Sequence, residues 1–170
     1  MLELHKNEQY FFDQSSLEEL VKYLKPWKSI ACLCAPLLGK TLVERGHPVT
    51  ILDIDKRFEV VPGFQYFDIY QPWWLDNQFD LIFCDPPFFN TSLSQLFHAI
   101  RILSHHSWEQ PLMISYLVRR SKAILGTFRP FQLRAINYYP TYQTVKACQK
   151  NEIQLFGNID FVSNEIDEII

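Results

Sequence analysis

The sequence predicts an α/β domain with a doubly wound, mainly parallel sheet and helices on both faces. Short apolar runs alternate with helical stretches along the chain, with no internal repeat and no linker between them. Acidic residues follow three of the apolar runs, where such a sheet has its ligand-binding edge. The 170 residues are enough to bury a core, so we expect a single domain over 1–170.

Five apolar runs have the length and composition of buried strands. The predicted strands cover 29–34 (SIACLC), 49–55 (VTILDID), 64–69, 79–84 (FDLIFC) and 111–118 (PLMISYLV). Beyond them, 131–138 and 152–157 are predicted to pair as a closing antiparallel hairpin. The acidic tail over 164–170 is expected to be loosely held.

Apolar residues at helical spacing predict the helices between these strands. The predicted helices cover 17–24, 37–45, 91–103 and 119–128. Ser15 or Ser16 can cap the first helix and Pro26 stops it, while Thr91 or Ser92 can cap the third.

The charge balance bears on the possible partners. The formal net charge is −3, whereas nucleic-acid-binding proteins usually carry a basic surplus because phosphate neutralisation supplies much of their affinity. A local cluster of Arg119, Arg120 and Lys122 could still contact phosphates, although a solvated helix start explains it slightly better. Composition therefore leaves both nucleic acids and proteins as partners.

The four cysteines do not form a metal-binding motif. Cys32 and Cys34 are separated by one residue, whereas a zinc knuckle has two between its cysteines, so we expect no metal site. No signal-peptide core and no membrane-spanning run is visible. We therefore expect a cytoplasmic protein with reduced thiols and no membrane partner.

The most informative residues are Asp85, Pro86, Pro87 and Phe88, which directly follow a predicted strand. Two consecutive prolines fix two φ angles and remove two N–H donors, so the loop is stiff and presents carbonyl oxygens. A substrate amine could donate one hydrogen bond to the Asp85 carboxylate and one to the Pro86 carbonyl, which would aim its lone pair at a methyl donor. Phe88 would offer a flat face for stacking. A loop that only left the strand would need neither the carboxylate nor the ring.

This tetrapeptide matches the [Asp/Asn]-Pro-Pro-[Tyr/Phe] motif of methyltransferases that act on the amino group of adenine N(6), glutamine or lysine. Four segments, EQYFFDQSSLEEL, IACLCAPLLGKTL, ILDIDKRFE and LIFCDPPFFN, resemble one branch of that group over roughly residues 8–90. The branch contains the elongation factor 1-alpha lysine methyltransferases, first described as N(6)-adenine methyltransferases, and a zinc-containing ribosomal RNA adenine methyltransferase. The resemblance implies a Rossmann-like class I methyltransferase fold with S-adenosylmethionine as cofactor.

The resemblance implies that the turn after the first strand passes the methionine part of the cofactor. The residues of that turn are Cys34, Ala35 and Pro36. Most methyltransferases of this fold have a glycine-rich turn here, whereas this chain has APLLG, with Gly39 as its single glycine. A general glycine fingerprint would therefore miss this chain.

The resemblance also implies roles for the acids at the strand ends. Asp53 would accept hydrogen bonds from both ribose hydroxyls of the cofactor, with Asp55 as the rival for that role. Asp68 would accept from the amino group of the cofactor's adenine.

An aromatic segment near the N-terminus completes the implied cofactor site. Tyr10, Phe11 and Phe12 would fold over the cofactor as a lid, together with the rest of the segment over 1–27. No zinc finger and no RNA-binding appendage is visible, so substrate recognition would fall to the catalytic domain itself.

Two substrates are compatible with these residues. The leading hypothesis is methylation of the exocyclic amine of adenine in RNA or DNA, and the alternative is a protein lysine, whose amine must first lose a proton. A catalytically idle binding subunit is a distant alternative, because the motif is intact. A nucleotide-dependent dehydrogenase is less favoured still, because the phosphate-binding glycines are missing. The sequence does not predict an oligomeric state.

Overall fold

The computed structural model describes residues 1–160, so the predicted tail over 164–170 lies outside the described residues. One sheet forms the centre of the molecule, with the strand order β3-β2-β1-β4-β5-β7-β6. Its strands are β1 (Ile30–Leu33), β2 (Thr50–Asp53), β3 (Phe64–Tyr66), β4 (Leu81–Cys84), β5 (Leu112–Leu117), β6 (Arg134–Ala135) and β7 (Ile153–Gly157).

The pairing of the strands confirms the predicted mainly parallel sheet. Strands β1 to β5 pair in parallel, whereas β7 runs antiparallel between β5 and β6. From β1 the chain adds β2 and then β3 on one side of the sheet. It then returns to place β4 on the other side of β1, so β1 and β4 are neighbours where the strand order changes direction. In sheets of this kind the ligand site lies at that point, beyond the carboxyl ends of the strands.

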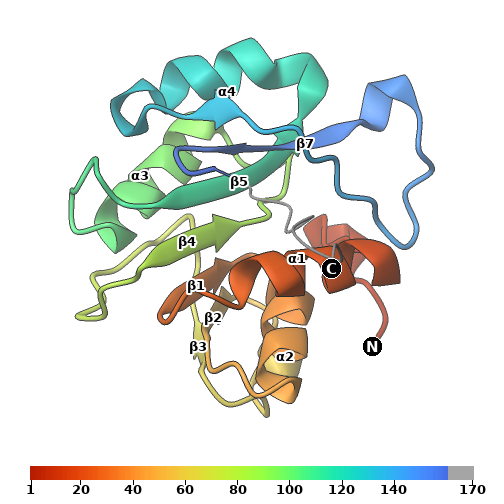
Figure 1. Cartoon of the computed structure of the whole chain (residues 1–170), viewed down its shortest axis with the longest axis vertical. Coiled ribbons are helices and arrows are strands. Elements are labelled where there is room, and N and C mark those ends of the chain that lie inside the picture. Colours follow the sequence, from red (N-terminus) through yellow and green to blue (C-terminus); the bar gives the residue numbers. More distant parts are fainter. Residues whose placement is uncertain (161–170) are drawn as a thin grey trace, which may run out of the picture.

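Helices cover both faces of the sheet (Figure 1). The four α-helices are α1 (Gln14–Leu24), α2 (Pro36–Glu44), α3 (Leu93–Leu103) and α4 (Ser121–Thr127). The apolar side chains of β1 alternate between the two faces. Ile30 and Cys32 pack with α1 and α2, while Ala31 and Leu33 pack with α3 and α4. Every residue of β1 is therefore buried, as its unbroken apolar sequence predicts.

Two predicted boundaries differ from the structure at residues with polar side chains. Helix α1 is capped by Asp13, whose Oδ1 accepts from Ser16 N at 2.9 Å, and not by Ser15 or Ser16. Strand β2 ends at Asp53, two residues early, because Asp55 begins the short 3-10 helix η2. In both cases the boundary is set by an aspartate whose side chain accepts a hydrogen bond from a nearby backbone N–H group.

The C-terminal half contains two further differences. The predicted helix over 119–128 is divided into the 3-10 turn η3 (Val118–Arg120) and the short helix α4. The predicted strand over 131–138 is reduced to the two residues of β6, because Gln132 has a positive φ of 57° after the turn η4 (Arg129–Phe131).

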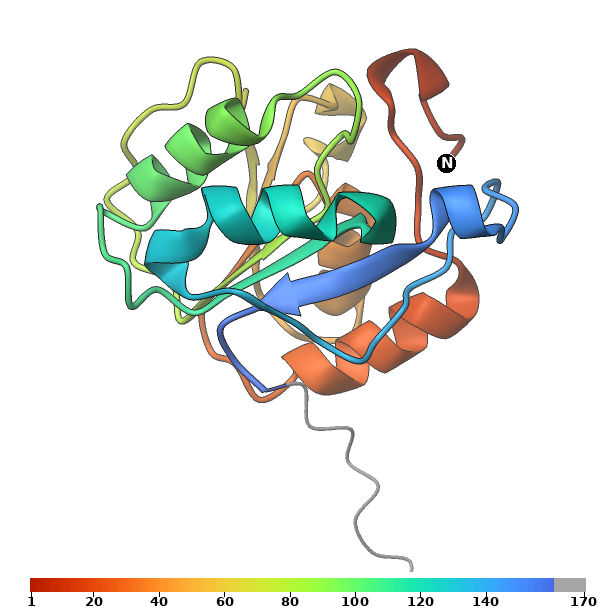
Figure 2. The same cartoon turned by 90° about the horizontal axis from the view of Figure 1, so that it is seen from above.

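The N-terminal segment is tied to a loop from the far end of the chain. Phe12 and Tyr142 form an antiparallel bridge, and Gln143 N donates to Phe11 O at 2.9 Å. Figure 2 shows this red segment beside the blue loop that precedes β7. The pairing brings Tyr142 to the edge of the sheet where β4 ends.

Gly39 in α2 allows that helix to lie close against the sheet. A Cβ atom at this position would be 2.5 Å from Ile51 Cγ1, which is far inside van der Waals contact. Gly126 in α4 provides a matched comparison, because a Cβ atom there would meet nothing within 4 Å.

We expect Gly39→Ala to lower the free energy of unfolding by about 1–3 kcal/mol, because the added methyl group overpacks the α2–β2 contact. Gly126→Ala should instead leave it unchanged or raise it by up to about 1 kcal/mol, because alanine favours a helix. Urea denaturation of both variants measures this. Equal stability of the two variants would contradict the packing described here.

Candidate active site

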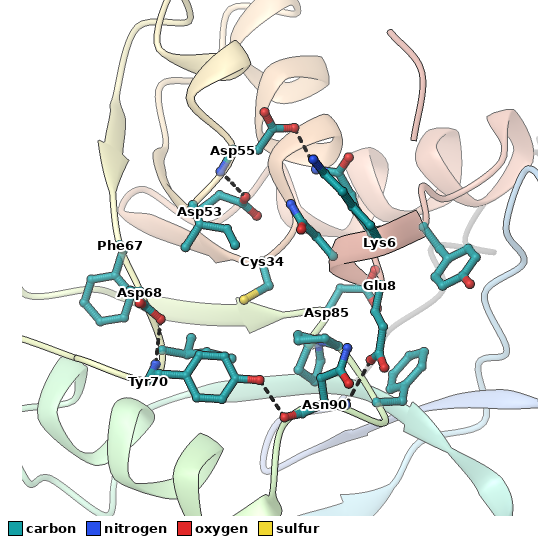
Figure 3. Close-up of a pocket in the computed structure, with 18 of the residues that line it drawn as sticks. Lys6, Glu8, Cys34, Asp53, Asp55, Phe67, Asp68, Tyr70, Asp85 and Asn90 are labelled. Atoms are coloured by element: carbon teal, nitrogen blue, oxygen red, sulfur yellow. Dashed lines mark hydrogen bonds between the residues drawn. The ribbon is translucent and has the colours of Figure 1, made fainter. Parts of the chain in front are cut away.

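A cavity of about 250 Å³ lies beyond the carboxyl ends of β1 to β4 (Figure 3). Its walls come from four strand ends, from the N-terminal segment and from the loop before β7. The lining residues are 6–10, Cys34, 53–55, 67–70, 85–88, Asn90 and Tyr142. The cavity therefore lies where the sequence places the informative residues, at the ends of the parallel strands.

Asp85, the residue that follows β4, lies in this cavity and is 8% exposed. Its Oδ1 accepts hydrogen bonds from Ser115 Oγ in β5 and from Tyr142 OH, the latter at 2.7 Å. Within residues 1–160, no group donates to Oδ2 and no cation pairs with the carboxylate. Burial raises the pKa of Asp85 to about 7, although the two hydroxyl donors act against that rise. One oxygen thus remains available to a ligand.

The loop after Asp85 is held from both sides. Phe88 packs edge-on against Tyr116 in β5, with 5.7 Å between the ring centroids and an angle of 80° between the rings. Glu8 Oε2 accepts from Phe89 N at 2.9 Å and from Asn90 N at 3.2 Å. These contacts supplement the stiffness of Pro86 and Pro87, both of which line the cavity.

Asp53 and Asp55 are both buried but differ in their partners. Asp55 accepts from Arg57, with 2.7 Å between its Oδ2 and Nη2, and from Gln9 Nε2 at 2.8 Å. Despite burial, these donors lower the pKa of Asp55. Asp53 accepts only backbone N–H groups, such as Asp55 N at 2.8 Å, and burial raises its pKa to about 6. Asp53 is therefore the more available of the two acceptors.

Asp68 and Tyr70 form the wall beyond β3. Asp68 Oδ1 accepts from Tyr70 N at 2.8 Å, while Tyr70 OH donates to Asn90 O at 2.6 Å. The second contact links the wall to the loop that follows Asp85, as Figure 3 shows.

The turn after β1 has a backbone conformation that glycine usually adopts, although the residue there is a cysteine. Cys34 has a positive φ of 55°, in the left-handed region where glycine is usually found. Its thiol lies between Asp53 and Asp85 (Figure 3), and a hydrogen bond with Cys84, burial and these carboxylates all raise its pKa. Cys34 lines the cavity, whereas Ala35 and Pro36 are buried where α2 begins and do not line it.

Only part of the predicted lid reaches the cavity. Tyr10 lines it, together with the four residues before it. Phe11 and Phe12 are buried in the core instead, with 3% and 2% of their surface exposed. Phe11 packs edge-on against Phe58, and Phe12 packs edge-on against Phe83. Helix α1 packs in the apolar layer over the sheet, because its apolar stripe is buried there.

Sequence reasoning missed several residues of this site. Ser115 and Tyr142 are 30 and 57 residues from Asp85 in the chain and have no motif of their own. Glu8 begins one of the quoted segments, but only the fold brings it to the catalytic loop. Tyr70 could have been found, since it lies two residues beyond the predicted acid Asp68 at a strand end.

Within residues 1–160, neither a metal-binding cluster nor a membrane-spanning helix is present. No group of three or more His, Cys, Asp or Glu side chains is arranged to hold a metal ion. In the same part of the chain, no helix is long and apolar enough to cross a membrane.

Comparison with known proteins gives a family match and a shared fold. Residues 3–161 match the sequence model of the family described as "Probable N6-adenine methyltransferase", which confirms the resemblance seen in the sequence. No sequence among the curated proteins matches the chain.

Several solved structures share the fold at low sequence identity. Magnesium protoporphyrin IX methyltransferase from Synechocystis PCC 6803, solved with bound S-adenosylmethionine, has a TM-score of 0.58 and 15% identity over 85% of this chain and 78% of that chain. An S-adenosylmethionine-dependent methyltransferase from Clostridium acetobutylicum ATCC 824 has a TM-score of 0.58 and 10% identity over 85% and 92%. The N-methyltransferase NodS from Bradyrhizobium japonicum WM9, in complex with S-adenosyl-L-homocysteine, has values of 0.53 and 14% over 85% and 86%. The predicted Rossmann-like class I methyltransferase fold is thereby confirmed.

The buried Asp85 carboxyl should make the stability depend on pH. Its pKa of about 7 exceeds the ordinary value of about 3.9, so between these pH values the native state binds a proton that the unfolded chain has lost. Stability therefore falls as pH rises through this window. Asp85→Asn, which keeps an oxygen for Ser115 and Tyr142, should be more stable than the natural chain at pH 8 by roughly 1–4 kcal/mol.

Denaturation of the natural chain and of Asp85→Asn at pH 4 and pH 8 measures this difference. The two should be about equally stable at pH 4, where both carry a neutral side chain. Asp76→Asn serves as the control for loss of a carboxylate from the surface. An Asp85→Asn variant less stable than the natural chain at pH 8 would contradict a carboxylate buried without a cation.

Proposed function

Because the chain belongs to the family of probable N6-adenine methyltransferases, we propose that it transfers a methyl group from S-adenosylmethionine to the exocyclic amine of an adenine in RNA or DNA. The observation that carries this proposal is the pair formed by Asp85 and Phe88. Asp85 has one carboxylate oxygen that accepts no hydrogen bond within residues 1–160, and both Asp85 and the aromatic ring of Phe88 line the cavity. An adenine offers an N–H donor to the first and a ring to the second.

The residues of the cavity fit S-adenosylmethionine as the cofactor. Charged lining residues are five acids and one base, namely Glu8, Asp53, Asp55, Asp68, Asp85 and Lys6. A surplus of carboxylates suits a ligand that carries a sulfonium and an ammonium group. Asp53 is the proposed acceptor for the ribose hydroxyls, and Asp68 for the adenine amine.

The proposed chemistry requires positioning and the exclusion of water. S-adenosylmethionine, when bound, supplies an electrophilic methyl group on a positively charged sulfur. The Asp85 carboxylate accepts one N–H of the substrate amine at Oδ2, and the Pro86 carbonyl accepts the other. Ser115 and Tyr142 hold Oδ1, so the carboxylate cannot rotate freely. The methyl group that the amine nitrogen gains would leave the cofactor's sulfur, which would keep the bonding electron pair, and the amine would release one proton, for which the Asp85 carboxylate is an acceptor.

A protein lysine is the second candidate substrate because three aromatic side chains line the cavity that contains Asp85. Tyr10, Phe88 and Tyr142 all line the cavity near Asp85. Such rings can also enclose an ammonium group. The net charge of −3 would favour a basic protein as substrate.

Two variants separate cofactor binding from catalysis. Asp53→Ala should weaken S-adenosylmethionine binding by about 1–3 kcal/mol, the typical cost of stranding hydrogen-bonding groups. Asp85→Ala should leave that affinity nearly unchanged but abolish methyl transfer, because it removes the acceptor for the amine. Calorimetry and a labelled-methyl assay measure the two effects. If neither the natural chain nor the two variants bind S-adenosylmethionine, the proposal fails. Full turnover by Asp85→Ala would show that the loop is only structural.

Substitution of Phe88 separates adenine from lysine. If the ring stacks on adenine, Phe88→Leu should lose about 1–3 kcal/mol of transition-state binding, while Phe88→Tyr should remain active. A lysine side chain would lose less, because leucine can still wall an apolar channel. The measurement is kcat/KM of the three proteins on each substrate. A penalty for Phe88→Leu no larger than that for Phe88→Tyr would contradict stacking.

The pH profile gives an independent test of the same question. Asp85 must be ionised to accept the amine, so the rate on adenine should rise as pH increases through about 7 and then level off. A lysine reaction should keep rising toward the amine's ordinary pKa of about 10.4. Initial rates between pH 6 and pH 10 distinguish the two. A rate that still climbs above pH 9 would favour lysine.

A further inference from the structure

A second cavity of about 260 Å³ adjoins the first on the side away from Asp53. The two cavities share Tyr10, Phe88 and Tyr142, so these three side chains form the boundary between them. The charges on the two sides of this boundary differ. Among residues 1–160, five of the six charged residues that line the first cavity are acids, whereas Lys146 is the single charged residue that lines the second.

Two arginines extend the positive charge of the second cavity. Arg119 and Arg120 belong to η3, which follows β5. Arg120 Nη1 donates to Tyr116 OH at 2.9 Å and lies 3.4 Å from Phe88 O, so it reaches the catalytic loop. Arg119 lies over the ring of Phe89, 5.7 Å from its centroid. Within residues 1–160, neither arginine forms an ion pair with a carboxylate.

Phe89 adds an exposed aromatic face to this basic surface. Its side chain is 65% exposed, although the loop that carries it is stiffened by two prolines and anchored by Glu8. A large ring held in water beside an arginine suits a base that stacks on it. Phe88, by contrast, is half-buried and faces the first cavity.

Two of the carboxylates near this surface already accept hydrogen bonds from the protein, whereas Glu152, whose backbone oxygen accepts from Val118 N beside Arg119, forms no ion pair within residues 1–160. Glu8 accepts from the backbone N–H groups of Phe89 and Asn90. Glu3 accepts from Phe11 N at 2.7 Å and from the hydroxyl of Thr144, which lines the second cavity. The three cations therefore have no ion-pair partner among the described residues and remain available to an external anion.

We propose that Phe89, Arg119, Arg120 and Lys146 form the surface that holds the single strand next to the target nucleotide. Arg119 and Lys146 contact the phosphates on either side, and Phe89 stacks on the neighbouring base. This inference rests on the proposed nucleic-acid substrate and assigns it a binding surface. A basic protein would be repelled by the same three cations.

The test measures binding without turnover. Fluorescence anisotropy of a labelled single-stranded RNA 20-mer that contains adenines, titrated at several salt concentrations, compares the natural chain with Arg119→Ala/Lys146→Ala. Losing two phosphate contacts should reduce the slope of log K against log salt by about 1.4. Phe89→Ala should weaken binding about 5- to 100-fold.

Matched controls and a second probe complete the test. Lys22→Ala/Arg129→Ala removes the same two charge types from positions that line neither cavity, and it should bind as the natural chain does. An unchanged slope in Arg119→Ala/Lys146→Ala would overturn the inference. So would tighter binding of a lysine-rich peptide by the natural chain than by that variant.

A parallel assay of methyl transfer separates this inference from the proposed function. If the natural chain binds the RNA through these residues but methylates no adenine, the surface stands and the proposed function fails. If it methylates adenine and the double variant has the same KM for RNA, the proposed function stands and the surface is refuted.

Discussion

The site depends on a carboxylate that is buried without a cation. Asp85 is desolvated at the end of β4, and within residues 1–160 only two hydroxyl groups, those of Ser115 and Tyr142, donate hydrogen bonds to its carboxylate. Burying a charge in this way costs stability, which a protein retains only where the charge is used. The buried carboxylate lies where the carboxyl ends of the parallel strands meet, which is the ligand-binding edge of a doubly wound sheet. The backbone bridge between Phe12 and Tyr142 positions the Tyr142 hydroxyl, which donates to the same carboxylate from a loop near the other end of the chain.

The charges around Asp85 divide the region into two halves. The acidic cavity suits a cationic cofactor, while the neighbouring cavity and its arginines suit an anionic substrate. Three aromatic side chains, those of Tyr10, Phe88 and Tyr142, line both cavities and form the boundary between them, and Tyr142 donates to Asp85 there. The net charge of −3 does not by itself indicate the substrate, because three of the 16 lysines and arginines, Arg119, Arg120 and Lys146, lie beside the catalytic loop.

The sequence predicted those parts of the site that depend on strand ends. Asp53, Asp68 and Asp85 each follow an apolar run, and parallel strands bring such positions together. It could not predict Tyr142, because nothing local marks a residue whose role arises from a bridge to Phe12 across the chain. The aromatic run over 10–12 predicted the right segment, but only Tyr10 of these three lines the cavity, while Phe11 and Phe12 are both buried in the core. Helix and strand ends differed by a few residues where Asp13 and Asp55 bind nearby backbone N–H groups.

The most direct test of this account is to identify the methylated product. The natural chain and Asp85→Ala are incubated with methyl-labelled S-adenosylmethionine and with RNA, DNA and protein extract in parallel, and the products are digested to nucleosides and amino acids. We expect label in N6-methyladenine from RNA or DNA with the natural chain, and none with Asp85→Ala. Label confined to protein lysine, or equal label from both proteins, would contradict it.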